Sequence, residues 1–308
     1  MAVDEPKRQH YVPRTYLKNF QVDDTGRINV LGKRKQKIFE ANIQNVGVEK
    51  DFYTVEDFQD KYIWEKAYAN GIEPLMGDLI PKVRSRCENC LIRDYTEVIT
   101  MDEKVKLSLI MVIQLLRSKG IREYENSLLP EIILTVVKSA KEEFADLNEN
   151  QKHFLDTLWN NEKMLKQSYM QIATDKNRIT QYTTLFFMRN FLIFRIIGPE
   201  EFIVGDNPVI FMDDNKDVEN IFGGGLTDSN TVLYYPLSPK LLLGAFHKNW
   251  CSTVPDVFDR RIAFLDGTYG SSLINSHNQR QYDRCSEYAF SKSKGTLSKV
   301  QIQSRFTR

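Results

Sequence analysis

The hydrophobic pattern of the chain changes its period twice, and this constrains the fold more than any other feature. Residues 26–43 alternate apolar and polar side chains around a Gly-Lys-Arg-Lys turn, which predicts a β-hairpin with a basic tip. From about residue 60 apolar residues recur at helical intervals, and from residue 199 short apolar runs alternate with turn residues. We therefore expect an α+β protein with a mostly helical middle, the hairpin near the N-terminus, and a small β-sheet formed from segments around 27–55 and 200–247.

The strongest helix signal covers residues 100–120. Thr100 and Glu103 have the spacing of a capping box, an apolar stripe follows, and Gly120 marks the end. Three further segments have helical spacing: 126–147, 149–173 and 179–197. The last of these is apolar on most sides, so we expect it to be a central helix.

The length and composition allow a large core, because the chain has 308 residues of which 42% are hydrophobic. We expect a single domain over residues 1–308, with these sub-regions: 1–60 motif and β-hairpin, 61–198 helical bundle, 199–250 β segment, 255–292 closing helix, and 293–308 basic tail. The longest apolar run is interrupted by Arg189, Asn190 and Arg195, whereas a membrane span needs about 20 mostly apolar residues. The first residues contain no apolar stretch typical of a secretory signal, so a cytoplasmic location without a membrane partner is expected.

Charge is unevenly distributed, although the formal net charge is only +1. Residues 1–50 contain ten Lys/Arg and six Asp/Glu, and residues 291–308 contain five basic residues and no acidic one. Clustered Lys and Arg suit a phosphate-bearing partner such as nucleic acid or a nucleotide. A solvated hairpin tip and a solubilising tail explain the same pattern. The sequence does not predict an oligomeric state.

Several motifs together resemble a known family. They are "QHYVPRTYLKNF" (9–20), "NVGVEKDFY" (45–53), Gln114 and Arg117 followed by Arg122, "FIVGDNPV" (202–209), "YPLSPKLLL" (235–243), and the late Asn275 and Asn278. In these features the chain resembles the bacterial family known as domain of unknown function 4238, from about residue 9 to about residue 290. The resemblance implies an architecture and candidate positions, but no reaction. One position departs from the family pattern, in which Gln most often follows the proline, since Arg14 stands there. Arg14 therefore cannot supply the side-chain amide that Gln provides at this position.

Three residues are candidates for catalysis. His10 can act as an acid, a base or a metal ligand, or it can be hydrogen-bonded structurally beside Pro13. Asp206 follows a predicted strand, where it could hold a cation or orient water, or it could close a turn together with Asn207. Glu49 is a further carboxylate candidate.

The candidates for binding a substrate or anion are Arg14, Gln114, Arg117, Arg122, Asn207, Asn275 and Asn278. Gln114 and Arg117 lie three residues apart and so share one helical face. The alternative is that Arg117 pairs with an acidic residue such as Glu65, Glu73 or Glu103 and joins helices. The late Asn residues could reach the same pocket or cap backbone groups.

No metal site can be assigned from spacing alone, and a divalent metal is kept as a candidate cofactor. Cys87 and Cys90 form a lone CxxC without a second pair, and the acidic loop near residues 213–224 has Val218 where a calcium loop needs Gly. Motifs for P-loop, dinucleotide, serine-hydrolase and zinc-protease chemistry are missing from the sequence. We expect a phosphodiester hydrolase acting on nucleic acid, with a non-enzymatic ligand-binding or sensor protein that has an anion-binding pocket as the alternative.

Overall fold

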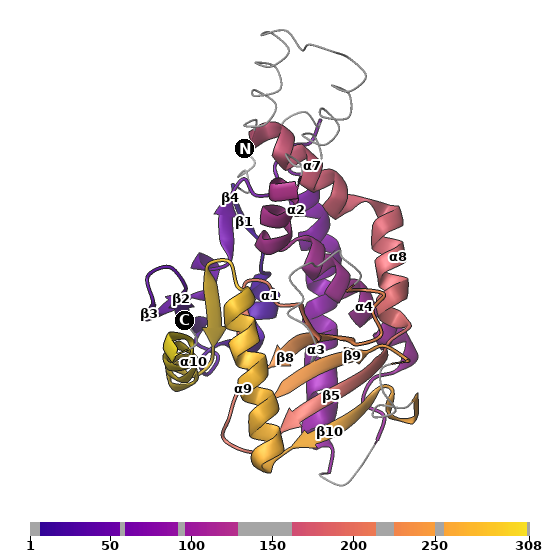
Figure 1. Cartoon of the computed structure of the whole chain (residues 1–308). Helices are drawn as coiled ribbons and strands as arrows, with labels where there is room; N and C mark the ends of the chain where they lie inside the picture. The colour runs from indigo at the N-terminus through magenta and orange to yellow at the C-terminus, as the bar shows by residue number, and fades with distance from the viewer. Residues whose placement is uncertain are drawn as a thin grey trace, which may run out of the picture.

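The computed structural model describes residues 7–55, 59–91, 96–128, 162–213, 225–249 and 256–306. Strands in these parts form two larger sheets and one short ribbon (Figure 1). The five-stranded sheet has the order β10 (Arg261–Leu265), β5 (Asn190–Ile196), β9 (Leu241–Phe246), β8 (Thr231–Ser238) and β7 (Ile210–Asp213). The four-stranded sheet has the order β3 (Lys37–Asn42), β2 (Arg27–Gly32), β11 (Tyr288–Ser291) and β6 (Val204–Gly205). In the ribbon, β1 (Arg8–His10) pairs antiparallel with β4 (Val48–Lys50).

Helices surround these sheets and confirm the α+β class. They are α1 (Arg14–Leu17), α2 (Ile63–Ala67), α3 (Glu73–Asn89), α4 (Met101–Leu116), α7 (Glu162–Thr174), α8 (Lys176–Phe187), α9 (Gly267–Arg284) and α10 (Lys294–Phe306). A π-helical turn, η3 (Tyr68–Ile72), joins α2 to α3. A further helical stretch covers residues 119–128. Short 3₁₀ turns are η1 (Lys18–Phe20), η2 (Ile43–Asn45) and η4 (Asp256–Phe258).

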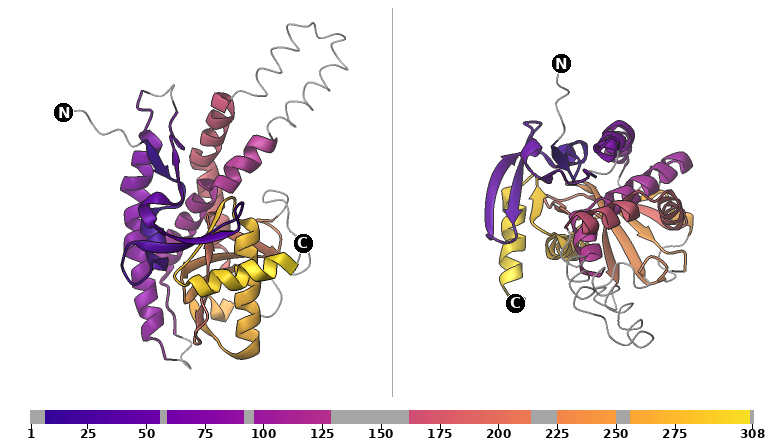
Figure 2. Two further views of the ribbon diagram at one scale, coloured as in Figure 1. Left: turned by 90° about the vertical axis from the view of Figure 1, so that its left-hand side faces the viewer. Right: turned by 90° about the horizontal axis from the view of Figure 1, so that it is seen from above.

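The five-stranded sheet is buried on both faces. Side chains of one face, such as Ile193 and Tyr235, join the core formed with α3, α4 and α8. Side chains of the opposite face, such as Phe194 and Tyr234, join a second cluster with Ile274 of α9. The left view of Figure 2 shows α3 and α9 on opposite sides of the sheet. Successive side chains of a strand point to opposite faces, so each strand here is apolar at nearly every position.

This double burial explains the main error in the predicted elements. Residues 179–197 were expected to be one central helix, but α8 ends at Phe187 and β5 begins at Asn190. A strand that is apolar at every position cannot be told from a buried helix by its period. The break falls at Arg189, whose Nη1 donates to the carbonyl of Thr231 at 2.6 Å and whose Nη2 donates to that of Leu226 at 2.8 Å.

The structure refines two other expectations. The four-stranded sheet combines the segments around 27–55 and 200–247 as expected, through β2, β3 and β6, but it also contains β11, and β7, β8 and β9 belong to the five-stranded sheet. The basic tail is largely the helix α10, whose Leu297 and Val300 are buried against Leu31. Both views of Figure 2 show α10 beside the β2–β3 hairpin. The expected helix 126–147 and the first part of 149–173 fall mostly outside the described residues, while α7 confirms a helix at the end of the latter.

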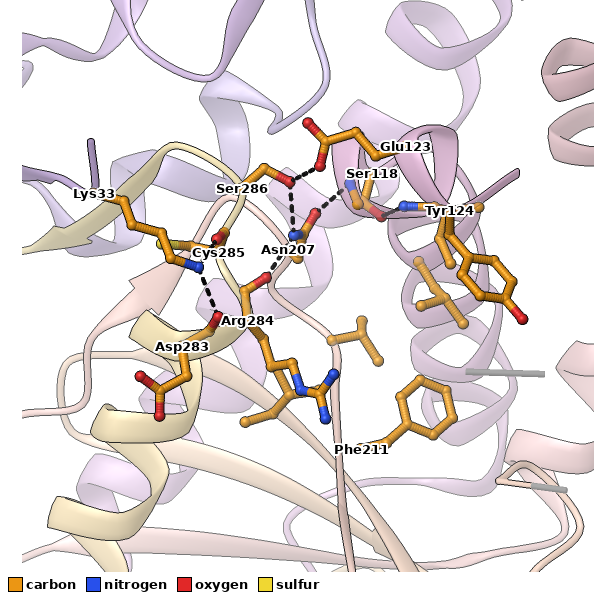
Figure 3. Close-up of a pocket in the computed structure, with 15 residues that line it drawn as sticks. Lys33, Ser118, Glu123, Tyr124, Asn207, Phe211, Asp283, Arg284, Cys285 and Ser286 are labelled. Atoms are coloured by element: carbon orange, nitrogen blue, oxygen red, sulfur yellow. Dashed lines mark hydrogen bonds between the residues drawn. The ribbon is translucent and has the colours of Figure 1, made fainter. Parts of the chain in front are cut away.

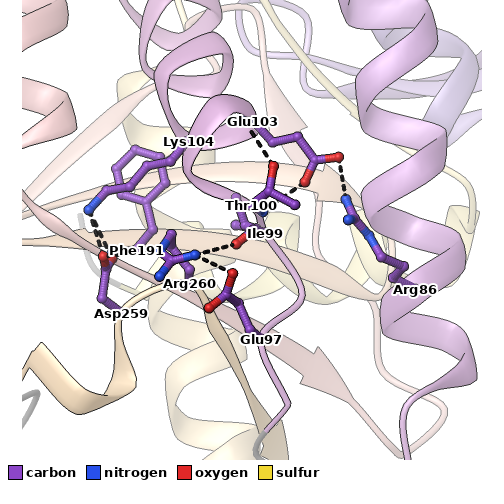
Figure 4. A network of polar contacts seen from close by, with 9 residues as sticks. All are labelled: Arg86, Glu97, Ile99, Thr100, Glu103, Lys104, Phe191, Asp259 and Arg260. Carbon is purple, nitrogen blue, oxygen red and sulfur yellow. Dashed lines mark hydrogen bonds and ion pairs between the residues drawn. The ribbon is translucent and has the colours of Figure 1, made fainter.

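The N-terminus of α4 is attached to the edge of the sheet by charged groups (Figure 4). The capping box is present, since the Glu103 backbone N–H donates to Thr100 Oγ1 at 3.2 Å and Thr100 N–H donates to Glu103 Oε2 at 2.8 Å. The buried Lys104 Nζ lies 2.8 Å from Asp259 Oδ2, and Asp259 Oδ1 accepts from the Phe191 N–H at 2.7 Å. This attachment fixes the axis of α4, whose other end carries Gln114 and Arg117.

Candidate functional site

The backbone of the first motif is held on both sides, which fixes the position of His10. Gln9 is buried, and its Nε2 donates to Thr54 Oγ1 at 2.9 Å while its Oε1 accepts from the Tyr53 N–H. Farther along the motif, Tyr16 stacks on Tyr235 with 5.0 Å between ring centroids and donates to the carbonyl of Pro236. The first motif and the "YPLSP" motif are therefore in direct contact.

Arg117 lies at the end of α4 and its side chain is completely buried. Its Nε donates to Tyr53 Oη at 3.0 Å, and its Nη2 donates to the carbonyl oxygen of His10 and lies 3.8 Å from Glu73 Oε1. The guanidinium also lies over the ring of Tyr68, 4.5 Å from the centroid. The expected pairing of Arg117 with an acidic residue is thus present with Glu73, but this contact is longer than a hydrogen bond.

The acidic side of this cluster comes from the region where α2 meets α3. Glu65 belongs to α2, Tyr68 begins the π-helical turn, and Glu73 begins α3. Helical turns of the π type are rare, and they occur frequently at functional sites. The turn brings acidic and phenolic side chains to the same buried arginine.

Polar atoms without a partner gather around Arg117. Within the described parts of the chain, the buried atoms without a hydrogen-bond partner include His10 Nε2, Glu65 Oε2, Tyr68 Oη, Gln114 Oε1 and Arg117 Nη1, and also Tyr169 Oη and Tyr235 Oη, on whose side chains the charge of Arg117 acts. Native proteins leave few buried polar groups unpaired, and each such group costs about 1–3 kcal/mol. We call His10, Glu65, Tyr68, Gln114 and Arg117 the Arg117 cluster. Three of them, His10, Gln114 and Arg117, were candidates from sequence alone.

The environment changes the protonation of two members of the Arg117 cluster. Burial, together with the positive charges of Arg14 and Arg117, lowers the pKa of His10 to about 4, although a backbone hydrogen bond at Gln44 opposes this shift. Burial raises the pKa of Glu65 to about 7, although Arg117 opposes it. At neutral pH His10 is therefore an uncharged imidazole, and Glu65 is close to half-protonated. Arg14 is exposed at the rim and acts on both groups.

The Asp206 carboxylate is also fully buried, but all its hydrogen bonds are internal. It accepts hydrogen bonds from the backbone N–H groups of Ser286 at 2.7 Å, Glu287 at 2.7 Å and Tyr288 at 3.0 Å. Burial raises the pKa of Asp206 to about 6, against the effect of these three donors. Asp206 therefore fixes the start of β11 to the loop after β6.

Side chains of the same loop and of α9 complete this attachment. Asn207 Oδ1 accepts from the Gly120 N–H at 2.8 Å, and its Nδ2 donates to the carbonyl of Arg284 at 2.7 Å. Asn278 Oδ1 accepts from the Ile203 N–H at 2.9 Å, and its Nδ2 donates to the carbonyl of Glu201 at 2.8 Å. Asn275 is exposed on α9. The late Asn residues thus lie apart from the Arg117 cluster.

Glu49 and Arg122 form a third group, on the other side of the β1–β4 ribbon. Arg122 Nη1 lies 3.1 Å from Glu49 Oε1, and Lys119 Nζ lies 3.2 Å from Glu49 Oε2. The negative charges that act on Tyr11 are those of Asp206, Glu287 and Glu49, whereas the charges that act on His10 are arginines. The adjacent residues His10 and Tyr11 therefore have different charged surroundings. Glu49 and Asp206 lie near Tyr11 and do not belong to the surroundings of His10.

A cavity of about 400 Å³ lies beside Asn207. Figure 3 shows Arg284 and Phe211 on one side of it, and Ser286 with Glu123 at the other, where the Ser286 hydroxyl donates to Glu123 Oε2 at 2.6 Å. Lys33 Nζ donates to the carbonyls of Asp283 and Cys285, both at 2.7 Å. Ser286 and Glu123 are therefore bonded to each other, and Lys33 is bonded to backbone carbonyls.

The described side chains that could bind a metal ion are not grouped as the metal sites considered from sequence would require. The described part of the chain contains no group of three or more His, Cys, Asp and Glu side chains placed to hold one ion. Cys87 is buried, and burial raises its pKa to about 12, so its thiol is protonated in the metal-free protein. The carbonyls of Cys87 and Cys90 instead accept from Arg195 Nη1 at 2.6 and 3.1 Å.

Some residues of these groups were not candidates. Tyr53 follows Glu49 in the second motif and Tyr68 lies in a segment predicted as helix, but aromatic residues at such places usually serve the core. Gln281 holds the same loop as Asn278, because its Oε1 accepts from the Gly205 N–H at 2.8 Å and its Nε2 donates to the carbonyl of Pro208 at 3.0 Å. Its position three residues after Asn278 on α9 is the only sequence signal that could have found it.

Comparison with known proteins gives a family and no function. No curated protein and no solved structure matches the chain. Among the described residues, no helix is long and apolar enough to cross a membrane. Residues 8–295 match the family model described as a protein of unknown function, DUF4238, and the chain therefore belongs to this family.

Proposed function

We propose that the protein binds a small ligand with an anionic group at the Arg117 cluster. The observation that carries the proposal is the completely buried guanidinium of Arg117, whose Nη1 has no partner among the described residues. A guanidinium is the side chain best suited to bind carboxylate or phosphate oxygens through its fixed N–H donors. A ligand oxygen at Nη1 would remove the cost of this unpaired donor.

The other members of the cluster define what else the ligand should carry. Gln114 Oε1 is an acceptor, and its amide is oriented because Nε2 donates to the carbonyl of Tyr11 at 3.2 Å. The imidazole of His10 is neutral at pH 7, because its pKa is about 4, so Nε2 can accept or donate according to its tautomer. The cluster therefore suits a ligand that combines an anionic group with N–H or O–H donors.

Phosphodiester hydrolysis on nucleic acid is the second candidate function, and the pKa values of two residues favour it. Glu65 with a pKa of about 7 can donate a proton, and His10 with a pKa of about 4 can accept one. Both groups are in these forms between about pH 4 and pH 7, as acid–base catalysis requires. Arg14 and Arg117 would stabilise the charge that develops on the phosphate. Glu49 and Asp206 have no role in this mechanism.

Histidine-selective NMR tests the binding proposal directly, because the chain has only four histidines. The ring signals of His10, assigned with His10→Gln, are expected to move when inorganic phosphate or a nucleoside monophosphate is added. The signals of His277 and His247 serve as internal controls, because they lie in other parts of the fold. Unchanged His10 signals at saturating concentrations of phosphate, nucleotides and small carboxylates would contradict the proposal.

The hydrolase is tested with fluorogenic RNA and DNA between pH 4 and 8, with and without divalent cations. The expected activity has a maximum near pH 5–6 and is lost in both His10→Gln and Glu65→Gln, while His247→Gln retains it. An active enzyme whose pH profile is unchanged in Glu65→Gln would assign the chemistry to other groups.

A further inference from the structure

We propose that one face of the β2–β3 hairpin binds a single-stranded nucleic acid. Side chains of the hairpin and of the neighbouring strand β11 form this face, which we call the hairpin face, and its residues are Arg34, Lys35, Lys37, Phe39 and Tyr288. It shares no residue with the Arg117 cluster, and it does not rest on the function proposed above. Proteins bind single strands on surfaces that combine cations for the phosphates with aromatic rings for the bases.

The strand register places two aromatic rings on the same face as Lys37. Successive side chains of a strand alternate between faces, so Lys37, Phe39 and Ala41 of β3 share one face. Gly32 of β2 pairs with Lys37 on one side and with Tyr288 of β11 on the other. A Cβ atom placed on Gly32 would lie 3.9 Å from a ring carbon of Phe39 and 3.9 Å from a ring carbon of Tyr288. The two rings therefore meet over Gly32.

The rings lie where the cover of this face ends. Phe39 is 38% exposed and Tyr288 is half-buried, whereas Val30 and Phe290 on the same face are completely buried in the main core. The helix α10 covers the opposite face, where Leu31 packs against it (Figure 2). The two rings are therefore the apolar part of the hairpin face that a ligand can reach.

The turn of the hairpin adds three cations. Arg34, Lys35 and Lys37 are exposed. Within the described parts of the chain, none of these three side chains forms an ion pair, a hydrogen bond or a ring contact. The three cations are thus available to the phosphates of a ligand.

Contacts with two helices fix the turn in place. Gln36 Nε2 donates to the carbonyl of Lys33 at 2.6 Å and to Tyr282 Oη of α9 at 2.5 Å. The carbonyl of Gln36 accepts from Gln301 Nε2 of α10. Lys33 Nζ itself binds two carbonyls at the end of α9. A surface that is fixed before binding loses less conformational entropy when the ligand arrives.

Carboxylates close to the hairpin face are already bound by other cations. Glu40 is the only acidic residue among residues 27–42, it points to the face opposite Phe39, and Arg27 binds it. Glu287 precedes β11, and Lys119 Nζ lies 2.7 Å from its Oε1. The hairpin face therefore keeps a net positive charge.

These features suit a single strand better than other polyanions. The cations can neutralise phosphates and release their counterions, and the rings offer surfaces on which unpaired bases stack. In a duplex the bases stack on one another, so a single strand alone presents their faces. A polyanion without bases, such as heparin, has nothing to place on the rings.

Fluorescence anisotropy of the full chain with a labelled oligothymidylate of about 12 nucleotides tests the proposal. We expect Phe39→Ala to weaken binding about fivefold or more, because a ring that stacks on a base contributes at least this much. The double variant Lys35→Gln/Lys37→Gln should lower the slope of log K against log salt by about 1.4, since each phosphate contact on a single strand contributes about 0.7. Its melting temperature should equal that of the wild type, because both lysines are exposed.

Two matched variants control for the loss of a ring and of charge elsewhere. Tyr269→Ala removes a ring that is 78% exposed on α9, about 20 Å along the helix from Tyr282. Lys18→Gln/Lys176→Gln removes two charges from exposed positions on other elements. Both controls should bind the oligonucleotide as the wild type does.

Three results would overturn the proposal. They are no binding of the oligonucleotide at low salt, an equal loss in Phe39→Ala and Tyr269→Ala, and competition by heparin or a DNA duplex that equals competition by the unlabelled single strand. His10→Gln separates the hairpin face from the Arg117 cluster. Binding that disappears in His10→Gln and persists in Phe39→Ala would place the nucleic acid at the Arg117 cluster instead.

Discussion

Two regions of the molecule bury a charged side chain from a sequence motif, and they treat it in opposite ways. Asp206 accepts hydrogen bonds from three backbone N–H groups, whereas Arg117 Nη1 has no partner among the described residues and belongs to a cluster with other unpaired polar atoms. Burial of a charge is costly unless hydrogen bonds compensate for it. The Asp206 region therefore has the features of a structural attachment, whereas the Arg117 cluster is where we propose that a ligand supplies the missing hydrogen bonds.

The largest effect that follows from this comparison concerns stability at the Asp206 region. Asp206→Ala removes the acceptor of three backbone N–H groups, and we expect it to lower the free energy of unfolding by about 3–5 kcal/mol. Chemical denaturation at pH 7.5 measures this change. Asn275→Ala is the matched control, since Asn275 is exposed and should change the value by less than about 0.5 kcal/mol. An Asp206→Ala protein that is as stable as the wild type but no longer binds ligand would contradict the structural role of Asp206.

The two regions also differ in how far they could be predicted from sequence. The start of α4 was predictable, because its capping box and apolar stripe are local signals, but its end was not: α4 ends at Leu116, and Gly120 lies in the next helical stretch. The partners of Asp206 were not, since Ser286 lies 80 residues away and contributes a backbone group that carries no residue signature. The strand β5 was missed because burial on both faces removes the period-two pattern.

The Arg117 cluster was predicted in part. His10, Gln114 and Arg117 were candidates because they lie in motifs, and Glu65 and Glu73 were possible partners of Arg117. The π-helical turn at Tyr68–Ile72 decides which acidic residue lies near Arg117, and no local sequence pattern predicts that turn. Glu49 and Asp206 were grouped with His10 by chemical type, and the fold separates them from it.

A smaller effect should appear in the pH dependence of stability at the Arg117 cluster. The pKa of Glu65 is raised from 4.5 to about 7, so the folded protein holds a proton that the unfolded chain releases. Stability from this group is therefore present below pH 4.5 and is lost as pH rises through 7. Glu65→Gln should remove that loss and make the protein more stable than the wild type at pH 8, by on the order of 2 kcal/mol.

His10 changes the stability in the opposite direction to Glu65 over nearly the same pH range. The two contributions therefore partly cancel in the pH dependence of stability of the wild type. The pKa of His10 is lowered from 6.5 to about 4, and stability from this group is lost as pH falls through that interval. His10→Gln should therefore be more stable than the wild type at pH 4. Denaturation of wild type and both variants at pH 4, 6 and 8 measures these shifts. Parallel curves for all three proteins would show that neither group is perturbed by the fold.

The smallest predicted effect concerns Arg14, where the chain departs from the family pattern. Arg14 is the largest charged contribution to the low pKa of His10, after burial. Arg14→Gln should therefore raise the pKa of His10 by less than about one unit while leaving stability nearly unchanged, because Arg14 is exposed. NMR titration of the His10 ring measures the shift. Lys18→Gln is the charge-matched control, since Lys18 is also exposed and is not among the charges that act on His10. An equal pKa shift in both variants would mean that the pKa of His10 responds to the overall charge of the protein. It would contradict a specific effect of Arg14 on His10.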